Sequence, residues 1–477
     1  MTKEIVILQS RLQLVDPQDC TDNSDTLALL EALFDALIRR APDGRYIPAL
    51  AESWELSEDA RQWRFRLRPG LRFHDGSPLD AEAMRFSITR MQRPEIGATL
   101  GAPAVWGQYL GGATIAAPDP MTLTIETREP CADLLDVLIS GYALPPHLAD
   151  EAGFLDHPVG SGAYRFESGT GGNEIRMVTN PDWRGGALPE RRLIWRQVPH
   201  AADRARALEL GEAQVATRLS PPDAAAIVGD VTCHDYIDPT SIIYLLNAAR
   251  GPFADPTVRR AVNLAVDRRA LIAEVLGGAG SPLGGFVSRF HAGAAPEPED
   301  IAPDRETAAK LLKDAGYGDG LAIEIDCPTR LPDEAQALTA ALARQLAEVG
   351  VSVTVHEVAD RVAYAEQVRD KKIHDMCVFD SSPMSTFRVL YEKIDSRVRG
   401  SWWEGYRNEA VEALLDRSRS TVDPAAREAL HRQSYAALRK DPPWLTLYHH
   451  TFTAALAGTH PDWRMRADGV LDVTTLP

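Results

Sequence analysis

The chain is poor in cysteine and lacks long apolar runs. Its cysteines form no CxxC pair and show no metal-ligand spacing, which argues against a zinc site or a dense disulfide framework. Buried free thiols are the expected state of all five: Cys20, Cys131, Cys233, Cys327 and Cys377. No run of about 18 apolar residues occurs, so no membrane-spanning helix is predicted.

Positive charge is also scarce. The 51 Lys and Arg residues are outnumbered by 68 Asp and Glu residues, which gives a formal net charge of -17. A nucleic-acid binder needs a surplus of cations on one face, so no nucleic-acid partner is expected. An acidic surface keeps a protein soluble, and the sequence predicts a monomer.

Sequence motifs of hydrolytic enzymes are missing. Neither GxSxG nor HExxH occurs, so a hydrolase acting on peptides or glycosides is the weaker alternative. His74 and Asp75 in "LRFHDGSPLDA" look like a catalytic pair, but no nucleophile or metal partner stands at a fixed spacing from them. Gly76 supplies backbone freedom and Asp75 can accept hydrogen bonds from turn amides, which favours a structural turn.

Length and composition indicate a multidomain globular protein. Its 477 residues exceed a single core, and 44% apolar with 25% charged residues can form large cores without metals. The N-terminus reads as a strand and has no signal-peptide pattern. Either the chain is cytoplasmic or its export signal lies outside this numbering.

Strands and helices alternate along much of the chain. After the first strand, Leu29, Leu30 and Leu33 repeat at helical spacing. Residues 45–160 read as short alternating strands, with a hairpin over 62–73, a strand over 121–127 and a helix capped by Asp80. Further strands and helices follow, with helices expected near 257–271, 305–315, 333–349 and 361–370. This alternation predicts an α/β protein with open sheets covered on both sides.

The block "PALAESWELSEDARQWRFRLRPGLRFHDGSPLDAEAMRFSITRM" resembles the signature of family 5 extracytoplasmic solute-binding proteins, the dipeptide, oligopeptide and nickel-type receptors of ABC importers. Further similar blocks follow in order: "GSGAYRFES", "NPDWRGG", "LLNAARGPFADPTVRRAVNLAVDRRALI", "KLLKDAGY", "GYRNEAVEALLDRS" and "PPWLTLYHH". The resemblance implies a two-lobed type II periplasmic-binding-protein fold with an extra β-rich subdomain. Domain I would hold 1–247 plus 448–477, with 45–160 inserted, and domain II would hold 248–447.

The resemblance also implies ligand-binding positions in domain II. Asp380 follows the strand "DMCVF", where an acidic residue of peptide-binding relatives pairs with the ligand's α-amino group; a helix N-cap is the plainer interpretation. Many relatives carry an acidic-Pro-acidic segment where this chain has "SSPMST", which leaves a ligand without a free amino terminus open. Arg330 follows another strand, at about the place where an arginine of dipeptide receptors clamps the ligand carboxylate. An arginine that merely lies on the surface fits the sequence equally well.

Other candidate contacts come from aromatic and polar residues. Trp402 and Trp403 form a doublet that can pack in the core or offer an aromatic platform to a sugar, base, side chain or cation. Thr21, Asp22 and Asn23 lie between a strand end and a helix start, where they can bind polar ligand atoms, with helix capping by Asp22 or Ser24 as the alternative. His449 and His450 are adjacent in a predicted strand, so they point to opposite faces and cannot chelate one metal together.

We therefore expect a non-enzymatic periplasmic receptor without a cofactor. It would close over a peptide-like or related small polar solute and deliver it to an ABC permease in the inner membrane. A receptor for an opine- or sugar-containing solute, or for a metal chelate, is the alternative. The lack of clustered His, Cys or Met in the sequence argues against a metal ligand set.

Overall fold

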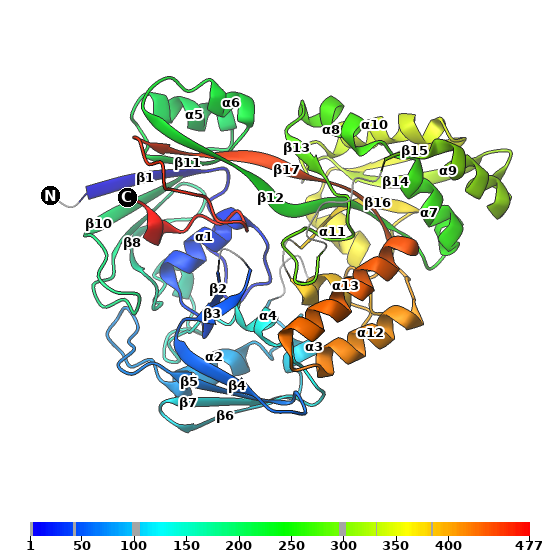
Figure 1. Ribbon diagram of the computed structural model, residues 1–477. Helices are drawn as coiled ribbons and strands as arrows, with labels where there is room; N and C mark the ends of the chain where they lie inside the picture. Colours follow the sequence, from blue (N-terminus) through cyan, green and yellow to red (C-terminus); the bar gives the residue numbers. More distant parts are fainter. Residues whose placement is uncertain (1–2, 42–43, 98–104, 295–301, 331, 383–384) are drawn as a thin grey trace. The chain divides into compact units, whose positions relative to one another are not determined.

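The computed structural model describes residues 3–41, 44–97, 105–294, 302–330, 332–382 and 385–477. The chain divides into two compact units (Figure 1). Unit 1 runs from the N-terminus to Tyr236 and resumes with Thr451–Pro477, and unit 2 contains Ile237–His450. The domain boundaries expected at 247/248 and 447/448 stay predictions.

The main sheet of unit 1 is built around the first strand. β1 (Lys3–Gln9) pairs in parallel with β10 (Arg191–Gln197) and β11 (Val215–Leu219). Its alternation buries Ile5 and Ile7 in a core with α1. The sheet also contains β9 (Glu174–Thr179), β8 (Tyr164–Thr170) and the second half of β17 (Trp444–Ala457). The helix that packs on this core is α1 (Ser24–Leu33).

A separate four-stranded sheet forms the β-rich part of unit 1. Its order is β4 (Ala51–Leu56), β5 (Gln62–Leu67), β7 (Thr122–Glu126) and β6 (Thr114–Asp119), all antiparallel. The alternation in β5 buries Trp63, Phe65 and Leu67 and leaves the arginines between them exposed. Helix α2 (Ala81–Arg90) contacts this sheet, and Asp80 caps it as predicted.

The hairpin predicted over residues 62–73 is wrong. β5 ends at Leu67 and pairs with β4 and β7 instead of with the residues that follow it. Residues 71–73 lead instead into a tight turn at residues 74–76, across which the amide of Phe73 donates to the carbonyl of Ser77 at 3.0 Å. The alternating pattern continued past Gly70, but only one isolated bridge, Arg72 to Pro78, forms there.

His74 and Asp75 belong to this turn. The amide of Gly160 donates to Nδ1 of His74 at 3.2 Å, and Nε2 lies 3.1 Å from the carbonyl oxygen of Gly162. These partners fit a neutral imidazole, and burial lowers the pKa of His74 to about 4. Asp75 accepts the amide of Ser77 at 2.9 Å, so the structural interpretation is confirmed.

The strands of unit 2 combine parallel and antiparallel pairs. β14 (Leu321–Pro328) is parallel to β15 (Val351–Val358) and β16 (Met376–Ser381), and β16 is antiparallel to β12 (Val231–Leu246). The sheet continues with β17, to which the short strand β13 (Gly280–Pro282) pairs. Its helices are α7 (Pro256–Ala265), α8 (Arg268–Leu276), α9 (Arg305–Leu312), α10 (Ala335–Ala347), α11 (Arg361–Arg369), α12 (Glu409–Ser420) and α13 (Pro424–Lys440).

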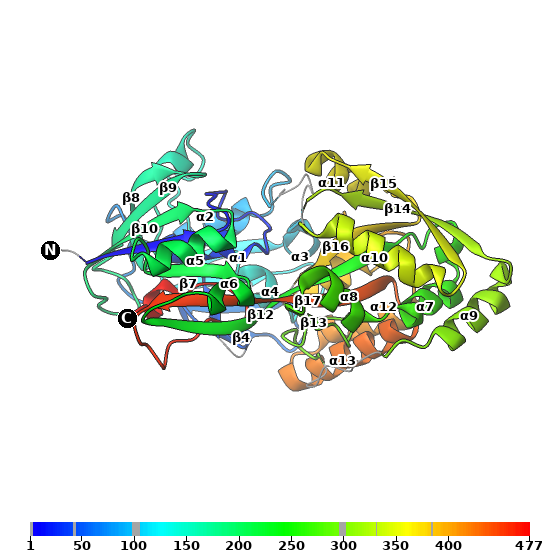
Figure 2. The same cartoon turned by 90° about the horizontal axis from the view of Figure 1, so that it is seen from above.

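Apolar side chains from many of these elements, α7 to α10 and β14 to β16 among them, form a buried core in unit 2. Val258, Val262 and Leu338 from the helices pack with Ile323 and Ile325 of β14. Helices α12 and α13 pack against each other, as both Figure 1 and Figure 2 show. The alternating strands and helices predicted for this part of the chain are confirmed.

Short elements complete the two units. In unit 1 they are β2 (Ile38–Arg40), β3 (Tyr46–Pro48), α3 (Gly107–Leu110), α4 (Leu135–Leu138), α5 (Ala201–Glu209), α6 (Pro221–Ala225) and single 3-10 turns at Phe154–Asp156 and Val473–Thr475. In unit 2 they are a 3-10 turn at Pro252–Ala254 and π-helical turns at Lys313–Tyr317 and Phe387–Tyr391.

All five cysteines lie in the described residues, and none of them forms a disulfide bond. Four of them are buried, as predicted, but Cys233 is exposed because it lies in the polar first part of β12. Among the described residues, none of the helices has both the length and the apolar character needed to cross a bilayer.

Candidate functional site

In unit 1, polar groups gather where β1 and β11 end. The Asp25 carboxylate, in the first turn of α1, accepts hydrogen bonds from Ser10 Oγ at 2.6 Å and from the amide of Arg11 at 3.2 Å. Its other oxygen lies 3.3 Å from Thr217 Oγ1 in β11. One buried carboxylate therefore ties two strand ends to the start of a helix.

The loop before α1 is shaped by capping. Asn23 Oδ1 accepts the amide of Thr26 at 3.0 Å, and Thr21 Oγ1 accepts the amide of Asn23 at 3.1 Å. Asn23 is therefore the N-cap, and the alternative that Asp22 or Ser24 caps the helix is wrong. Asp22 is half-buried beside these groups.

Arg218 is a unit 1 residue that the sequence did not single out. Its backbone has a φ of +53°, a left-handed conformation that is uncommon for a residue with a side chain. The guanidinium carbon lies 4.2 Å from the centroid of the Phe452 ring, and Nη1 lies 3.4 Å from Ser24 Oγ. A strained backbone at a strand end is a common feature of binding sites. Nothing in the sequence "QVATRLSPP" signals this conformation.

Gln9 is a second such residue. It ends β1, is 1% exposed, and neither its amide nitrogen nor its amide oxygen has a hydrogen-bond partner among the described residues. Leaving a buried amide unsatisfied costs about 1–3 kcal/mol. Gln9 therefore has an amide nitrogen with two N–H donors and an amide oxygen that no described residue satisfies.

In unit 2, Asp380 and Arg330 lie at strand ends as expected. β14 and β16 are parallel, so their C-terminal ends meet at one edge of the sheet. Asp380 is the next-to-last residue of β16 and is exposed, and Arg330 is exposed two residues after β14. Within the described ranges, neither side chain forms a hydrogen bond or an ion pair. Asp380 is not a helix N-cap, because it lies within the strand.

The tryptophan doublet lies in a turn near the same strand. Trp402 is buried, and its ring centroid is 4.9 Å from that of Phe379. Because neighbouring residues of a strand point to opposite faces, Trp402 lies on the face of β16 opposite to Asp380. Trp403 is half-buried, and its Nε1 donates to the carbonyl of Tyr406 at 2.6 Å. Trp402 is thus a core residue, and Trp403 has the more accessible ring.

His449 and His450 face different partners, as predicted from their adjacency. Nδ1 of His449 lies 3.3 Å from the carbonyl oxygen of Thr240, and burial lowers the pKa of this imidazole to about 4. Nε2 of His450 lies 2.7 Å from Glu334 Oε1, which also accepts the hydroxyl of Tyr448 at 2.8 Å. Burial is the largest single influence on Glu334 and opposes its ionisation, but the hydrogen bond and charge of His450, a backbone hydrogen bond and the hydroxyl of Tyr448 together outweigh it and lower the pKa of Glu334.

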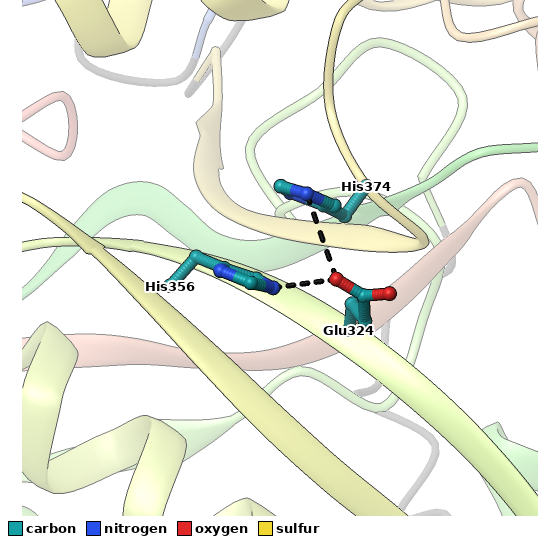
Figure 3. Close-up of side chains that lie close together, drawn as sticks. All are labelled: Glu324, His356 and His374. Atoms are coloured by element: carbon teal, nitrogen blue, oxygen red, sulfur yellow. Dashed lines mark hydrogen bonds and ion pairs between the residues drawn. The ribbon is translucent and has the colours of Figure 1, made fainter.

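A cluster of histidines exists in unit 2 that the sequence did not reveal. Glu324 of β14, His356 of β15 and His374, which precedes β16, bring three ligand atoms within 4.8 Å of one another (Figure 3). The absence of clustered His, Cys or Met in the sequence gave no sign of this group. The three residues are up to 50 positions apart in the sequence, and only strand pairing brings them together.

The family is decided by comparison with known proteins. The family model described as bacterial extracellular solute-binding proteins, family 5 (middle), matches residues 45–387. The chain belongs to this family. A curated relative, the glutathione-binding protein GsiB of Salmonella paratyphi A, is 27% identical over 465 residues, which cover 93% of this chain and 88% of that protein.

Two solved structures show the family's fold. The periplasmic binding protein DppA from Helicobacter pylori, in complex with the peptide STSA, superimposes with a TM-score of 0.79 at 21% identity and covers 98% of this chain and 96% of that one. AgaA from Agrobacterium (A. tumefaciens R10), in complex with agropinic acid, gives a TM-score of 0.76 at 22% identity and covers 95% and 93%. The predicted two-lobed type II periplasmic-binding-protein fold is confirmed.

Proposed function

We propose that this protein is a periplasmic, monomeric receptor that captures a peptide-like or related small polar solute by closure of its two lobes. It then delivers the solute to an ABC permease and performs no chemistry on it. The proposal is supported by membership of family 5 and by a relative that binds glutathione, itself a peptide. A structural neighbour bound to a peptide adds support.

The exposed carboxylate of Asp380 carries the chemical part of the proposal. A carboxylate at a strand end, without an ion-pair partner in the described chain, can form a charge-assisted hydrogen bond with a ligand ammonium group. Arg330 is placed at the end of the neighbouring parallel strand, and its guanidinium suits a ligand carboxylate. These two roles would make unit 2 selective for a zwitterion.

A second candidate solute class is favoured by one observation. AgaA has this fold and is bound to agropinic acid, an opine that joins amino-acid and sugar chemistry. Trp403 is half-buried and could stack on a sugar ring. An opine- or sugar-containing solute is therefore the alternative, ahead of a metal chelate or a hydrolase function.

Calorimetry on the full chain tests the proposal. Glutathione, a panel of di- to tetrapeptides and an opine are titrated into the protein, and small-angle scattering measures the radius of gyration with and without the ligand that binds. We expect saturable binding with a smaller radius of gyration and no turnover. An unchanged radius at verified saturation, or hydrolysis of the bound solute, would contradict the receptor function.

Asp380→Asn tests the site, with Asp370→Asn as the control. Asp370 is a carboxylate in the loop after α11, where it forms ion pairs with Arg369 and Lys372. If Asp380 binds an ammonium group, its loss weakens binding at least tenfold, about 1.4 kcal/mol, while the control changes little. Equal affinities of the two variants would remove Asp380 from the site.

A further inference from the structure

The three side chains of the unit 2 cluster share one oxygen atom as their centre. Nε2 of His356 lies 2.5 Å from Glu324 Oε2, and Nε2 of His374 lies 3.6 Å from the same oxygen (Figure 3). The first distance is a hydrogen bond, but the second is too long to be one. A histidine–glutamate ion pair therefore explains His356 and leaves the orientation of His374 unexplained.

Asp326 fixes the orientation of the His374 side chain through two contacts. This carboxylate is buried, with a side chain only 1% exposed. One of its oxygens lies 2.7 Å from Nδ1 of His374, and the other accepts the backbone amide of His374 at 2.7 Å. The carboxylate fixes the proton of the imidazole on Nδ1 and leaves the lone pair on Nε2, which is the arrangement found behind metal-binding histidines.

The two imidazoles are stacked, with centroids 4.1 Å apart and planes inclined by 11°. Asp375, whose Oδ2 accepts the amide of Glu324 at 2.9 Å, adds a further carboxylate. The surroundings are thus rich in negative charge and suited to a cation.

We propose that Glu324 Oε2, His356 Nε2 and His374 Nε2 form a three-ligand site for a divalent transition-metal ion such as Zn²⁺. The side chains are 49%, 39% and 41% exposed, so an ion can enter and a fourth position stays open to water. Zn²⁺ takes imidazole nitrogen and carboxylate oxygen at about 2.0–2.2 Å, which places neighbouring ligand atoms roughly 3.4 Å apart. The two nitrogen–oxygen distances in the cluster, 2.5 Å and 3.6 Å, lie on either side of that spacing.

The donor set selects among metals. Two imidazoles and one carboxylate suit Zn²⁺, Ni²⁺ or Cu²⁺, whereas Mg²⁺ and Ca²⁺ prefer oxygen ligands alone. The site also differs in place from the proposed solute contacts of unit 2. His374 precedes β16 and Asp380 is near its end, so roughly 20 Å of extended chain separates the two. Metal binding here is therefore independent of the proposed solute function.

Calorimetric titration of Zn²⁺ into the full chain, without a histidine tag and in a non-chelating buffer, tests the proposal. We expect one site that is lost in the His356→Gln/His374→Gln double variant and kept in His200→Gln, which alters an exposed histidine of unit 1. Asp326→Asn, a change at a positioning residue, should weaken binding about 10- to 100-fold and shift the visible absorption of bound Co²⁺. Asp380→Asn should leave Zn²⁺ binding unchanged.

The proposal is overturned if Zn²⁺ does not bind, if it binds equally to the double variant, or if Mg²⁺ binds equally well. Should the double variant fail to fold, footprinting of the unaltered protein with diethyl pyrocarbonate decides the question. Zn²⁺ must then protect His356 and His374 and leave His200 reactive, and equal reactivity with and without Zn²⁺ counts against the site.

Discussion

Nη2 of Arg184 lies 2.7 Å from Oδ1 of Asp35, and both side chains are at least 90% buried. Nε1 of Trp183 donates to the other oxygen of Asp35 at 3.1 Å. The tryptophan and arginine of the "NPDWRGG" block thus hold one buried carboxylate of unit 1. The motif has a structural role, because a buried charge is tolerated only when it is paired and hydrogen-bonded.

Removing this carboxylate should destabilise unit 1 strongly. Asp35→Ala leaves the Arg184 guanidinium buried without its partner, and we expect the free energy of unfolding to fall by about 3–5 kcal/mol. Urea denaturation followed by tryptophan fluorescence measures the loss. Glu52→Ala is the control, because Glu52 and Arg66 form an exposed ion pair whose loss should cost about 1 kcal/mol or less. Similar losses in both variants would argue against the buried pair.

His74 predicts how stability depends on pH. Its pKa is lowered by burial from 6.5 to about 4, so between these values the unfolded chain binds a proton that the folded chain does not. The stability that the neutral His74 contributes is therefore present above pH 6.5 and is lost as the pH drops toward 4. The contribution of this one group at pH 4 is a loss of about 3 kcal/mol.

The pH effect is measured by urea denaturation at intervals between pH 7 and pH 4. His74→Asn should make the decline shallower, because the asparagine has no proton to take up. His147→Gln serves as the control. His147 is exposed, and its Nε2 lies 2.9 Å from Oδ2 of Asp75, the residue that follows His74. If His74→Asn and His147→Gln change the pH profile equally, the assignment to His74 is wrong.

Much of the fold could be predicted from local patterns. The alternation in β5, the cap at Asp80 and the strands β14, β15 and β16 depend on periodicities that neighbouring residues set. The prediction of a hairpin over residues 62–73 was wrong because tertiary contacts, and not the strand's own sequence, decide which strands pair. The family's ordered motifs supplied the two-lobed fold.

The candidate sites were less visible in the sequence. The positions of Asp380 and Arg330 at strand ends could be predicted because strand ends can be located from the pattern, and their roles in solute binding stay predictions. The positive φ of Arg218 and the unpaired amide of Gln9 have no sequence signature. Glu324 and His374 could not be related to each other before the pairing of β14 and β16 was known. Long-range contacts, which sequence patterns do not encode, decide such clusters.

Gly405 gives a further prediction about backbone strain. Its φ is +87°, and a Cβ atom at this position would lie 2.3 Å from the backbone nitrogen of Ala249. Gly277 also has a positive φ, +58°, but a Cβ there would meet nothing within 4 Å. Gly277→Ala should therefore cost about 1–2 kcal/mol, the left-handed penalty alone. Gly405→Ala should cost clearly more, because the backbone of Ala249 must also move. Equal thermal shifts of the two variants would contradict this difference.

Arg218 separates binding from stability in unit 1. Asparagine tolerates the left-handed conformation better than arginine does, so Arg218→Asn should leave the thermal midpoint unchanged or slightly raised. If the guanidinium over Phe452 binds a ligand carboxylate or another acceptor, the same variant should weaken solute binding at least tenfold. Arg206→Asn is the matched control, since Arg206 lies exposed on α5 in an ion pair with Glu209. Calorimetry with the solute found for the unaltered protein measures both variants. A loss of affinity accompanied by an equal loss of stability would mean that Arg218 supports the fold, whereas lost affinity at unchanged stability would identify the strained arginine as a binding residue.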